Sequence, residues 1–159
     1  MNEYIENKTF DEINIGDTSS IEHTLTKSDI DLFAIVSGDV NPAHVDEEYA
    51  SEDMFHEVVA HGMWGGSFIS TVLGTQLPGP GTIYLNQTLN FLRPVTIGDT
   101  ITAKVVVKDK ERQKKIIKLD CTCINQKNKE VITGEATVIA PTEKIRRKRV
   151  KLPKISLTD

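Results

Sequence analysis

The spacing of apolar and polar residues divides the chain into a first half with helical patterns and a second half rich in strands. Residues 18–24 alternate, which predicts a strand. A helix is predicted from Thr26, whose side chain can cap the first turn, to Gly38, a residue type that often ends helices. A short polar helix is predicted over residues 47–54. Residues 63–73 are apolar almost all round, as in a buried helix.

From residue 82 onward the period of the apolar residues changes to two, which predicts four strands joined by short polar turns. One face of each strand is apolar: Ile83, Leu85, Leu89 and Phe91; Ile101, Ala103, Val105 and Val107; Ile117, Leu119, Cys121 and Cys123; Ile132, Gly134, Ala136, Val138 and Ala140. We expect a four-stranded antiparallel meander that curves against one central helix. The fold class predicted is therefore α+β, with two layers.

The alternation stops after Ala140, and the chain then becomes rich in lysine and arginine. We therefore place one domain over residues 1–140 and interpret residues 141–159 as a basic, solvated C-terminal tail or linker. An alternative is a basic flap that helps to hold a phosphorylated ligand.

Composition narrows the classes of function. The 159 residues carry a net charge of −4, which argues against nucleic acid as the partner. No apolar run is long enough to span a membrane, and the first residues lack the apolar core of a signal peptide, so we expect a cytoplasmic protein. Cys121 and Cys123 fit neither a disulfide framework nor a zinc pattern, so we expect reduced core thiols and no metal.

Two stretches carry the candidate chemistry. In the first, Ser37–Asp46, an acid and an imidazole, Asp39 and His44, flank an Asn-Pro step. Because proline disfavours helical geometry in the residue before it, these two side chains cannot share one regular helix face, and we expect them on a rigid loop. In the second stretch, Ala60–Ser67, Gly62 begins the apolar helix, so its N–H has no intrahelical acceptor. An acid, an imidazole and a free donor are suited to proton transfer beside a carbonyl group.

Both stretches, in this order, resemble the signature of (R)-specific enoyl-CoA hydratases, the MaoC-like family. The resemblance covers roughly residues 18–140. It implies a hot-dog fold, in which a curved antiparallel sheet wraps round one long helix, and a homodimer or higher homo-oligomer. The implied reaction is the reversible addition of water to trans-2-enoyl-CoA, which gives (R)-3-hydroxyacyl-CoA without a cofactor. The chain is also similar to hydratase domains that precede a phosphate acyltransferase domain, which implies such a domain or protein as a partner.

The resemblance assigns roles to individual residues. Asp39 and His44 would be the acid–base pair, without a decision on which is acid and which is base, and Asn41 would orient their loop. The N–H of Gly62 would bind the thioester oxygen, and Ser70 falls where the family often keeps a small polar residue.

The remaining candidates have more ordinary interpretations. His61 is expected to brace the loop before Gly62, and His23 and His56 to be surface residues. Candidates for the wall of an acyl tunnel are Trp64, Leu73, Leu77 and Phe91, with Trp64 equally suited to the core.

Two other functions remain open on the same fold. An acyl-CoA thioesterase would use a carboxylate near the central helix, but no Asp or Glu lies between His61 and Leu92. A non-catalytic acyl-CoA-binding subunit would be expected to lack Asp39 or His44, and both are present.

Overall fold

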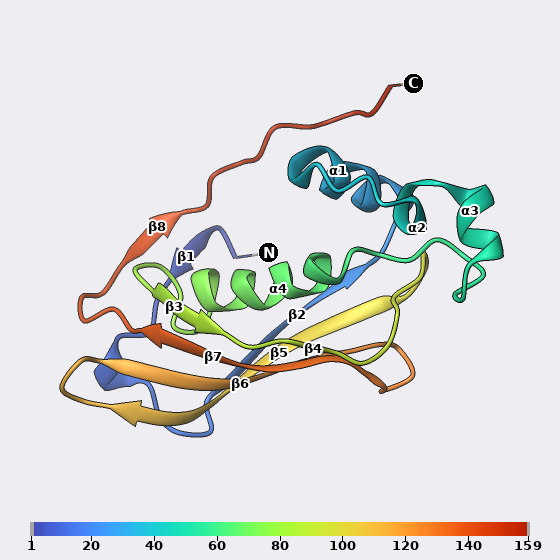
Figure 1. The fold of residues 1–159 in the computed structure, drawn as a ribbon. Helices are drawn as coiled ribbons and strands as arrows, with labels where there is room; N and C mark the ends of the chain where they lie inside the picture. The colour runs from blue at the N-terminus through green and yellow to red at the C-terminus, as the bar shows by residue number, and fades with distance from the viewer. Residues whose placement is uncertain (1, 159) are drawn as a thin grey trace.

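A curved antiparallel sheet wraps round one long helix in the computed structural model, which describes residues 2–158 (Figure 1). The helices are α1 (Lys27–Ser37), α2 (Pro42–Val45), α3 (Glu47–Glu52) and α4 (Gly62–Thr75), with a 3₁₀ turn at Phe10–Glu12. The strands are β1 (Tyr4–Glu6), β2 (Thr18–Thr24), β3 (Ile83–Gln87), β4 (Asn90–Phe91), β5 (Thr100–Glu111), β6 (Ile116–Ile124), β7 (Glu130–Ile139) and β8 (Arg146–Lys148). The expected α+β architecture is confirmed.

The strand order of the main sheet is β2-β5-β6-β7-β3, and β4 also pairs with β7. Strands β5, β6 and β7 form a meander, as predicted. The prediction of a four-stranded meander is wrong, because β3 pairs with β7 and not with its nearest successor in sequence. The place beside β5 is taken by β2, which pairs with it from Thr18 to Thr24. Alternation identifies strands and their buried face, but it carries no information on which strand lies beside which.

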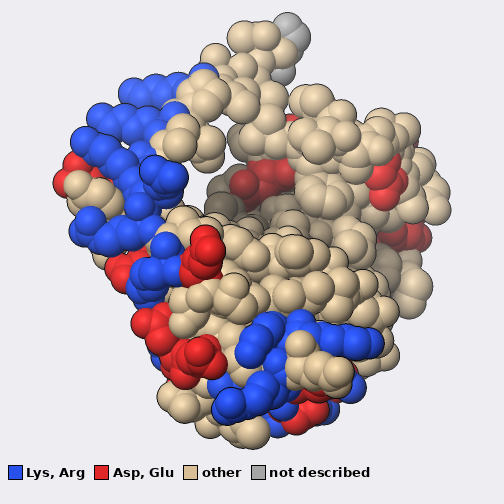
Figure 2. Space-filling view, turned by 90° about the vertical axis from the view of Figure 1, so that its left-hand side faces the viewer, with Lys and Arg blue, Asp and Glu red and all other residues tan. Residues whose placement is uncertain are grey.

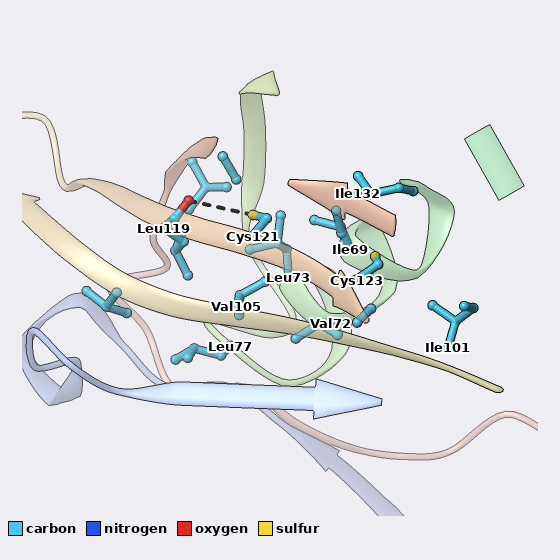
Figure 3. Packing of buried hydrophobic residues seen from close by; sticks show 14 of the residues in the cluster. Ile69, Val72, Leu73, Leu77, Ile101, Val105, Leu119, Cys121, Cys123 and Ile132 are labelled. Atoms are coloured by element: carbon cyan, nitrogen blue, oxygen red, sulfur yellow. Dashed lines mark hydrogen bonds between the residues drawn. The ribbon is translucent and has the colours of Figure 1, made fainter. Parts of the chain in front are cut away.

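Helix α4 packs its buried side against the concave face of the sheet (Figures 1 and 3). Ile69, Val72 and Leu73 are at most 1% exposed and share one core with the alternate residues of β5 and β6. The two thiols of β6 belong to this core, as predicted, and both are free. Burial raises the pKa of Cys121 to about 11 and that of Cys123 to about 12, so neither thiol is poised to react.

The register of β3 against β7 shifts between Tyr84 and Asn86, and regular pairing stops at Thr88 and Leu89, so the single strand predicted over residues 82–93 is wrong. The Thr88 N–H donates to the Glu135 carbonyl oxygen at 2.9 Å, and the Thr88 carbonyl lies directly over Gly134. A Cβ atom at Gly134 would overlap that carbonyl oxygen. Gly134 is therefore required by the close approach of another backbone.

Residues 27–57, which include α1, α2 and α3, form an overhang beyond the end of α4 (Figure 1). Thr26 and Asp29 form a capping box at the start of α1, as predicted, and Gly38 ends the helix in the left-handed conformation with φ of 76°. The short helix predicted over residues 47–54 is observed as Glu47–Glu52.

The segment that follows the sheet is not a simple solvated tail. Strand β8 pairs antiparallel with β1, and Lys144 forms ion pairs with Glu6 and Glu12. Its Nζ also donates to the backbone oxygen of Asn7 at 2.6 Å. Residues 142–148 are mostly exposed, as expected of a solvated segment, but they pair with the N-terminal segment. The sequence did not reveal this pairing, because the complementary acids lie more than a hundred residues away. The domain boundary at residue 140 stays a prediction.

Among residues 2–158, no helix combines the length and the apolar character needed to cross a membrane.

We predict that Gly134→Ala destabilises the protein by about 2 kcal/mol or more, because the added methyl group meets backbone that cannot move aside cheaply. Chemical unfolding in urea measures this change. Gly74→Ala is the matched control, since a Cβ there meets nothing within 4 Å and alanine favours the helix by up to about 1 kcal/mol. Equal stability of the two variants would contradict the close approach of the Thr88 carbonyl to Gly134.

Candidate active site

The loop that joins α1 to α2 is organised by its own polar side chains. The Asn41 side chain caps α2 by accepting from the Ala43 N–H at 3.1 Å, and Pro42 occupies the first turn of this short helix. One oxygen of Asp39 accepts from the Asn41 N–H, also at 3.1 Å. The other oxygen has no hydrogen bond to any described residue. Asn41 therefore fixes the loop locally, and Asp39 keeps an oxygen free in an exposed position.

Three hydrogen bonds, which we call the latch, fasten this loop to residues 59–61. His44 Nδ1 lies 2.7 Å from the carbonyl oxygen of Val59, and His61 Nε2 lies 2.9 Å from the carbonyl oxygen of Asp39. The Val59 N–H donates to the Ala43 carbonyl at 3.3 Å. The latch brings together the two stretches that the sequence analysis singled out.

The bonding partners decide the tautomer of each ring. A carbonyl oxygen can only accept, so the proton of neutral His44 lies on Nδ1 and the lone pair on Nε2. By the same reasoning, His61 carries its proton on Nε2. The two imidazoles stack, with centroids 4.0 Å apart and planes at 29°. His61 is only 3% exposed, and its Nδ1 has no partner among the described residues. His61 thus braces the loop and the ring of His44.

Helix α4 begins at Gly62, with His61 in the capping position. The N–H of Gly62 has no acceptor within the helix, and the helix dipole places positive potential at this end. A cavity of about 320 Å³ opens here and is lined by His44, His61, Gly62 and Trp64, among others. The ring of Phe91 lies 2.9 Å from where a Cβ of Gly62 would stand. The absence of a side chain at this position keeps the helix end open to the cavity.

A second apolar cavity of about 760 Å³ lies along α4 and β3. Ser70 lines this cavity and not the one beside His44, while Phe91 lines both. Two of the four tunnel candidates, Leu73 and Leu77, are instead in the buried core, at 1% and 3% exposed. Trp64 and Phe91 are the candidates that reach a cavity.

His23 is half-buried, with 42% of its side chain exposed, so it is a surface residue only in part. Its ring stacks on Phe68, meets Trp64 edge-on, and bonds to Asp29 at 3.1 Å. It lies on the side of β2 that faces α4, where alternation places it among core positions. His56 is exposed, as expected.

Asp39, His44 and His61 offer potential ligand atoms that all lie within 4.8 Å of one another. Because the two imidazoles are stacked near parallel, their in-plane lone pairs do not converge on one ion at about 2 Å from both. The expectation that no metal is used stays a prediction.

Two contributors to the site were missed by the sequence analysis. The Val59 carbonyl sets the tautomer of His44, but a backbone oxygen leaves no signal in the sequence. Arg93 lines the first cavity and donates to the Glu130 carbonyl at 2.5 Å. Arg93 stands directly before Pro94 in a predicted turn, and an arginine there is a candidate for binding anionic groups.

Comparisons with known proteins agree with this architecture. Residues 14–129 match the model of the MaoC-like domain. The chain is 51% identical to an (R)-specific enoyl-CoA hydratase of Rhodospirillum rubrum over 132 residues, covering 83% of this chain and 91% of the relative.

Two solved structures support the hot-dog fold. The unliganded R-hydratase PhaJ1 of Pseudomonas aeruginosa has a TM-score of 0.93 and 41% identity, over 98% of this chain and 99% of that one. The (R)-hydratase of Aeromonas caviae has a TM-score of 0.79 and 36% identity, over 81% and 98%. The match to the domain model spans most of the chain and contains both stretches of the site. The protein therefore belongs to the family of MaoC-like dehydratases, with the hot-dog fold that the sequence predicted.

Proposed function

We propose that the protein is an (R)-specific enoyl-CoA hydratase, a hydro-lyase that adds water reversibly to trans-2-enoyl-CoA to give (R)-3-hydroxyacyl-CoA. The observation that carries the proposal is the latch. It places the free oxygen of Asp39 and the Nε2 lone pair of His44 near the open N-terminus of α4. The expected substrate is thus an acyl-CoA thioester.

The pair can move protons without a net change in its own charge. A water molecule bound between Asp39 and His44 gives up one proton to the pair as its oxygen bonds to C3 of the substrate. A proton from the pair then reaches C2, so that the elements of water are added and the side chains return to their first state. Which of the two carries the proton in between is left open by this balance.

The thioester oxygen gains negative charge while C3 is attacked. The N–H of Gly62 is suited to stabilise that charge, because it is the first donor of α4 and lies at the positive end of the helix dipole. In other enzymes the loss of one such donor lowers the rate by about 10²–10³. This chemistry requires neither metal nor redox cofactor, since the thioester itself activates the double bond.

The alternative functions have less support. A thioesterase would attack the thioester carbonyl and release free CoA, and we expect such an enzyme to carry the carboxylate that directs the water on the central helix or just after it. No Asp or Glu occurs from His61 to Leu92. A non-catalytic subunit would have no use for a histidine whose tautomer leaves a free lone pair beside a free carboxylate oxygen.

We also propose a homodimer that forms along β3. This strand is an edge of the main sheet, and the exposed apolar residues around it are Met63, Ile83, Leu85, Phe91 and Leu92. Single chains rarely leave so many large apolar side chains together, and a free sheet edge is an additional pairing site. Cover by a second copy would also close the cavity that contains Ser70. A phosphate acyltransferase partner and a cytoplasmic location stay predictions from the sequence.

We predict that His44 in its neutral form is the Nδ1–H tautomer, because the Val59 carbonyl accepts from that nitrogen. The ¹⁵N chemical shifts of the imidazole, measured by NMR on the free protein, report the tautomer directly. Exposed His56, whose Nδ1 lies 3.4 Å from the Ser51 carbonyl oxygen, is the internal reference for a ring with only a long contact of the same kind. A dominant Nε2–H form of His44 would remove the free lone pair on which the proposed pair depends.

We predict that Asp39→Asn and His44→Gln each lower the hydration rate of crotonyl-CoA by about 10²-fold or more, because each removes one member of the proton-transfer pair. Loss of the enoyl-thioester absorbance measures the rate, and chiral analysis identifies the product. Glu48→Gln and His56→Gln are matched controls, as they make the same chemical changes at exposed positions outside the cavity.

Three outcomes would count against this function: an inert wild type, an (S)-alcohol product, or release of free CoA. Retained thermal stability of the two catalytic variants separates lost chemistry from lost folding.

A further inference from the structure

The basic and the acidic residues of this chain are concentrated on different segments. Residues 144–154 contain seven lysines and arginines and no acid, whereas the overhang, residues 27–57, contains nine acids and one lysine. Figure 2 shows a band of basic side chains that climbs one side of the molecule and ends beside a hollow. The net charge of −4 therefore conceals two strongly opposed surfaces.

The first part of the basic segment, residues 144–149, which we call the root, is bound to the N-terminal segment of the same chain. Strand β8 pairs with β1, Lys148 forms an ion pair with Glu3 at 3.0 Å, and the guanidinium of Arg146 lies 3.7 Å from the centre of the Tyr4 ring. The last contact is the Arg149 N–H, which donates to the Glu3 carbonyl at 2.9 Å. These contacts fix the direction in which the chain leaves the body.

From the end of this root, residues 149–158 form an extended arm that stands off the body (Figures 1 and 2). No described residue of the chain forms a hydrogen bond or ion pair with residues 150–158. The arm is nevertheless apolar at intervals: Val150 is 86% exposed, Leu152 85% and Ile155 69%. Lys151 and Lys154 lie between these residues. Leu157, near the end of the arm, is less exposed, at 42%. Alternating apolar and basic side chains that form no hydrogen bond or ion pair with the described part of their own chain are typical of a segment that packs on another surface.

The overhang has the complementary properties. Its acids include Glu48 and Glu52, both exposed on α3. It also exposes large apolar side chains: Val36 is 87% exposed, Val40 68% and Met54 81%. No ion pair joins the described part of the arm to the overhang of the same chain. Acid and apolar groups on one segment, with base and apolar groups on the other, make two surfaces that fit each other in charge and polarity.

We propose that the arm of one copy lies on the acidic overhang of a second copy. Ten extended residues span about 33 Å, which is enough to cross from the root to a neighbouring molecule. Two-fold symmetry would make the contact reciprocal, so that each copy gives one arm and receives one. The overhang carries Asp39 and His44, so the partner's arm would also hold the segment that bears the site. This contact is independent of the reaction proposed above.

The first test maps the contact directly. A photoreactive benzoylphenylalanine replaces Leu152, the purified protein is irradiated, and cross-linked peptides are identified by mass spectrometry. We expect a covalent dimer in which the photoreactive residue at position 152 is joined to a peptide from residues 27–57. The same probe at exposed Lys127 is the control and should give no dimer through that peptide. A link from Leu152 only within one chain, to another surface, or to nothing overturns the proposal.

The second test measures association. Lys151→Glu combined with Lys154→Glu should raise the dissociation constant of the oligomer about tenfold at low salt, with a smaller difference at high salt, because screening weakens surface charges. Sedimentation over a dilution series gives the constant. Lys127→Glu with Lys129→Glu changes the net charge equally and should have no such effect.

An unchanged dissociation constant for the arm variant contradicts the proposal. If the KM for crotonyl-CoA is raised at the same time, the basic residues are assigned instead to the phosphates of the substrate. The hydration rate of wild type is a separate readout, so failure of the arm contact and failure of the hydratase proposal can be told apart.

Discussion

The site depends on the latch, because the overhang contributes few side chains to the core and these three hydrogen bonds join its loop to residues 59–61. Of its residues, only Ile30, Ala34 and Ala50 are buried apolar side chains. The latch uses backbone carbonyls as acceptors at Val59, Asp39 and Ala43. Backbone atoms of a well-packed segment move less than side chains, so they set both the position of His44 and the nitrogen that holds its proton. Geometry and tautomer are thus fixed by the same bonds.

The segment that receives the latch is itself fixed by the sheet and the central helix. The Ala60 N–H donates to the Val95 carbonyl at 2.8 Å, and Val59 bridges to Thr96. One turn later, Gly65 allows close packing, since a Cβ there would stand 2.6 Å from the Ile132 side chain. The N-terminus of α4 therefore cannot shift without opening the core. The donor at Gly62 is held by packing, and the proton-transfer pair is held to the donor by hydrogen bonds.

The sequence was sufficient for features that depend on local chemistry. The capped start of α1, its stop at Gly38, the buried α4 and the core face of β5 to β7 all follow from residue type and period. Asp39 and His44 were identifiable because they flank an Asn-Pro step in one short loop. Gly62 was identifiable because it begins the apolar helix. Features that depend on distant partners were not predictable. The place of β3 beside β7, the pairing of β8 with β1 and the core-facing His23 each require knowledge of which segments meet.

The gap between β3 and β4 shows how such a distant contact shapes the cavity. Gly134 on β7 lets the Thr88 carbonyl approach, and pairing resumes at β4, where Phe91 stands opposite Ile132. The register against β7 is the same on both sides of this gap, since Gln87 pairs with Ala136 and Asn90 with Thr133. The one-residue shift lies earlier, between Tyr84 and Asn86, and such a shift reverses the face that later side chains occupy. Phe91 then lies against the open end of α4, where it lines both cavities. The missing side chain at Gly134 lets this stretch stay close to the neighbouring strand, and with it the aromatic wall of the space beside Gly62.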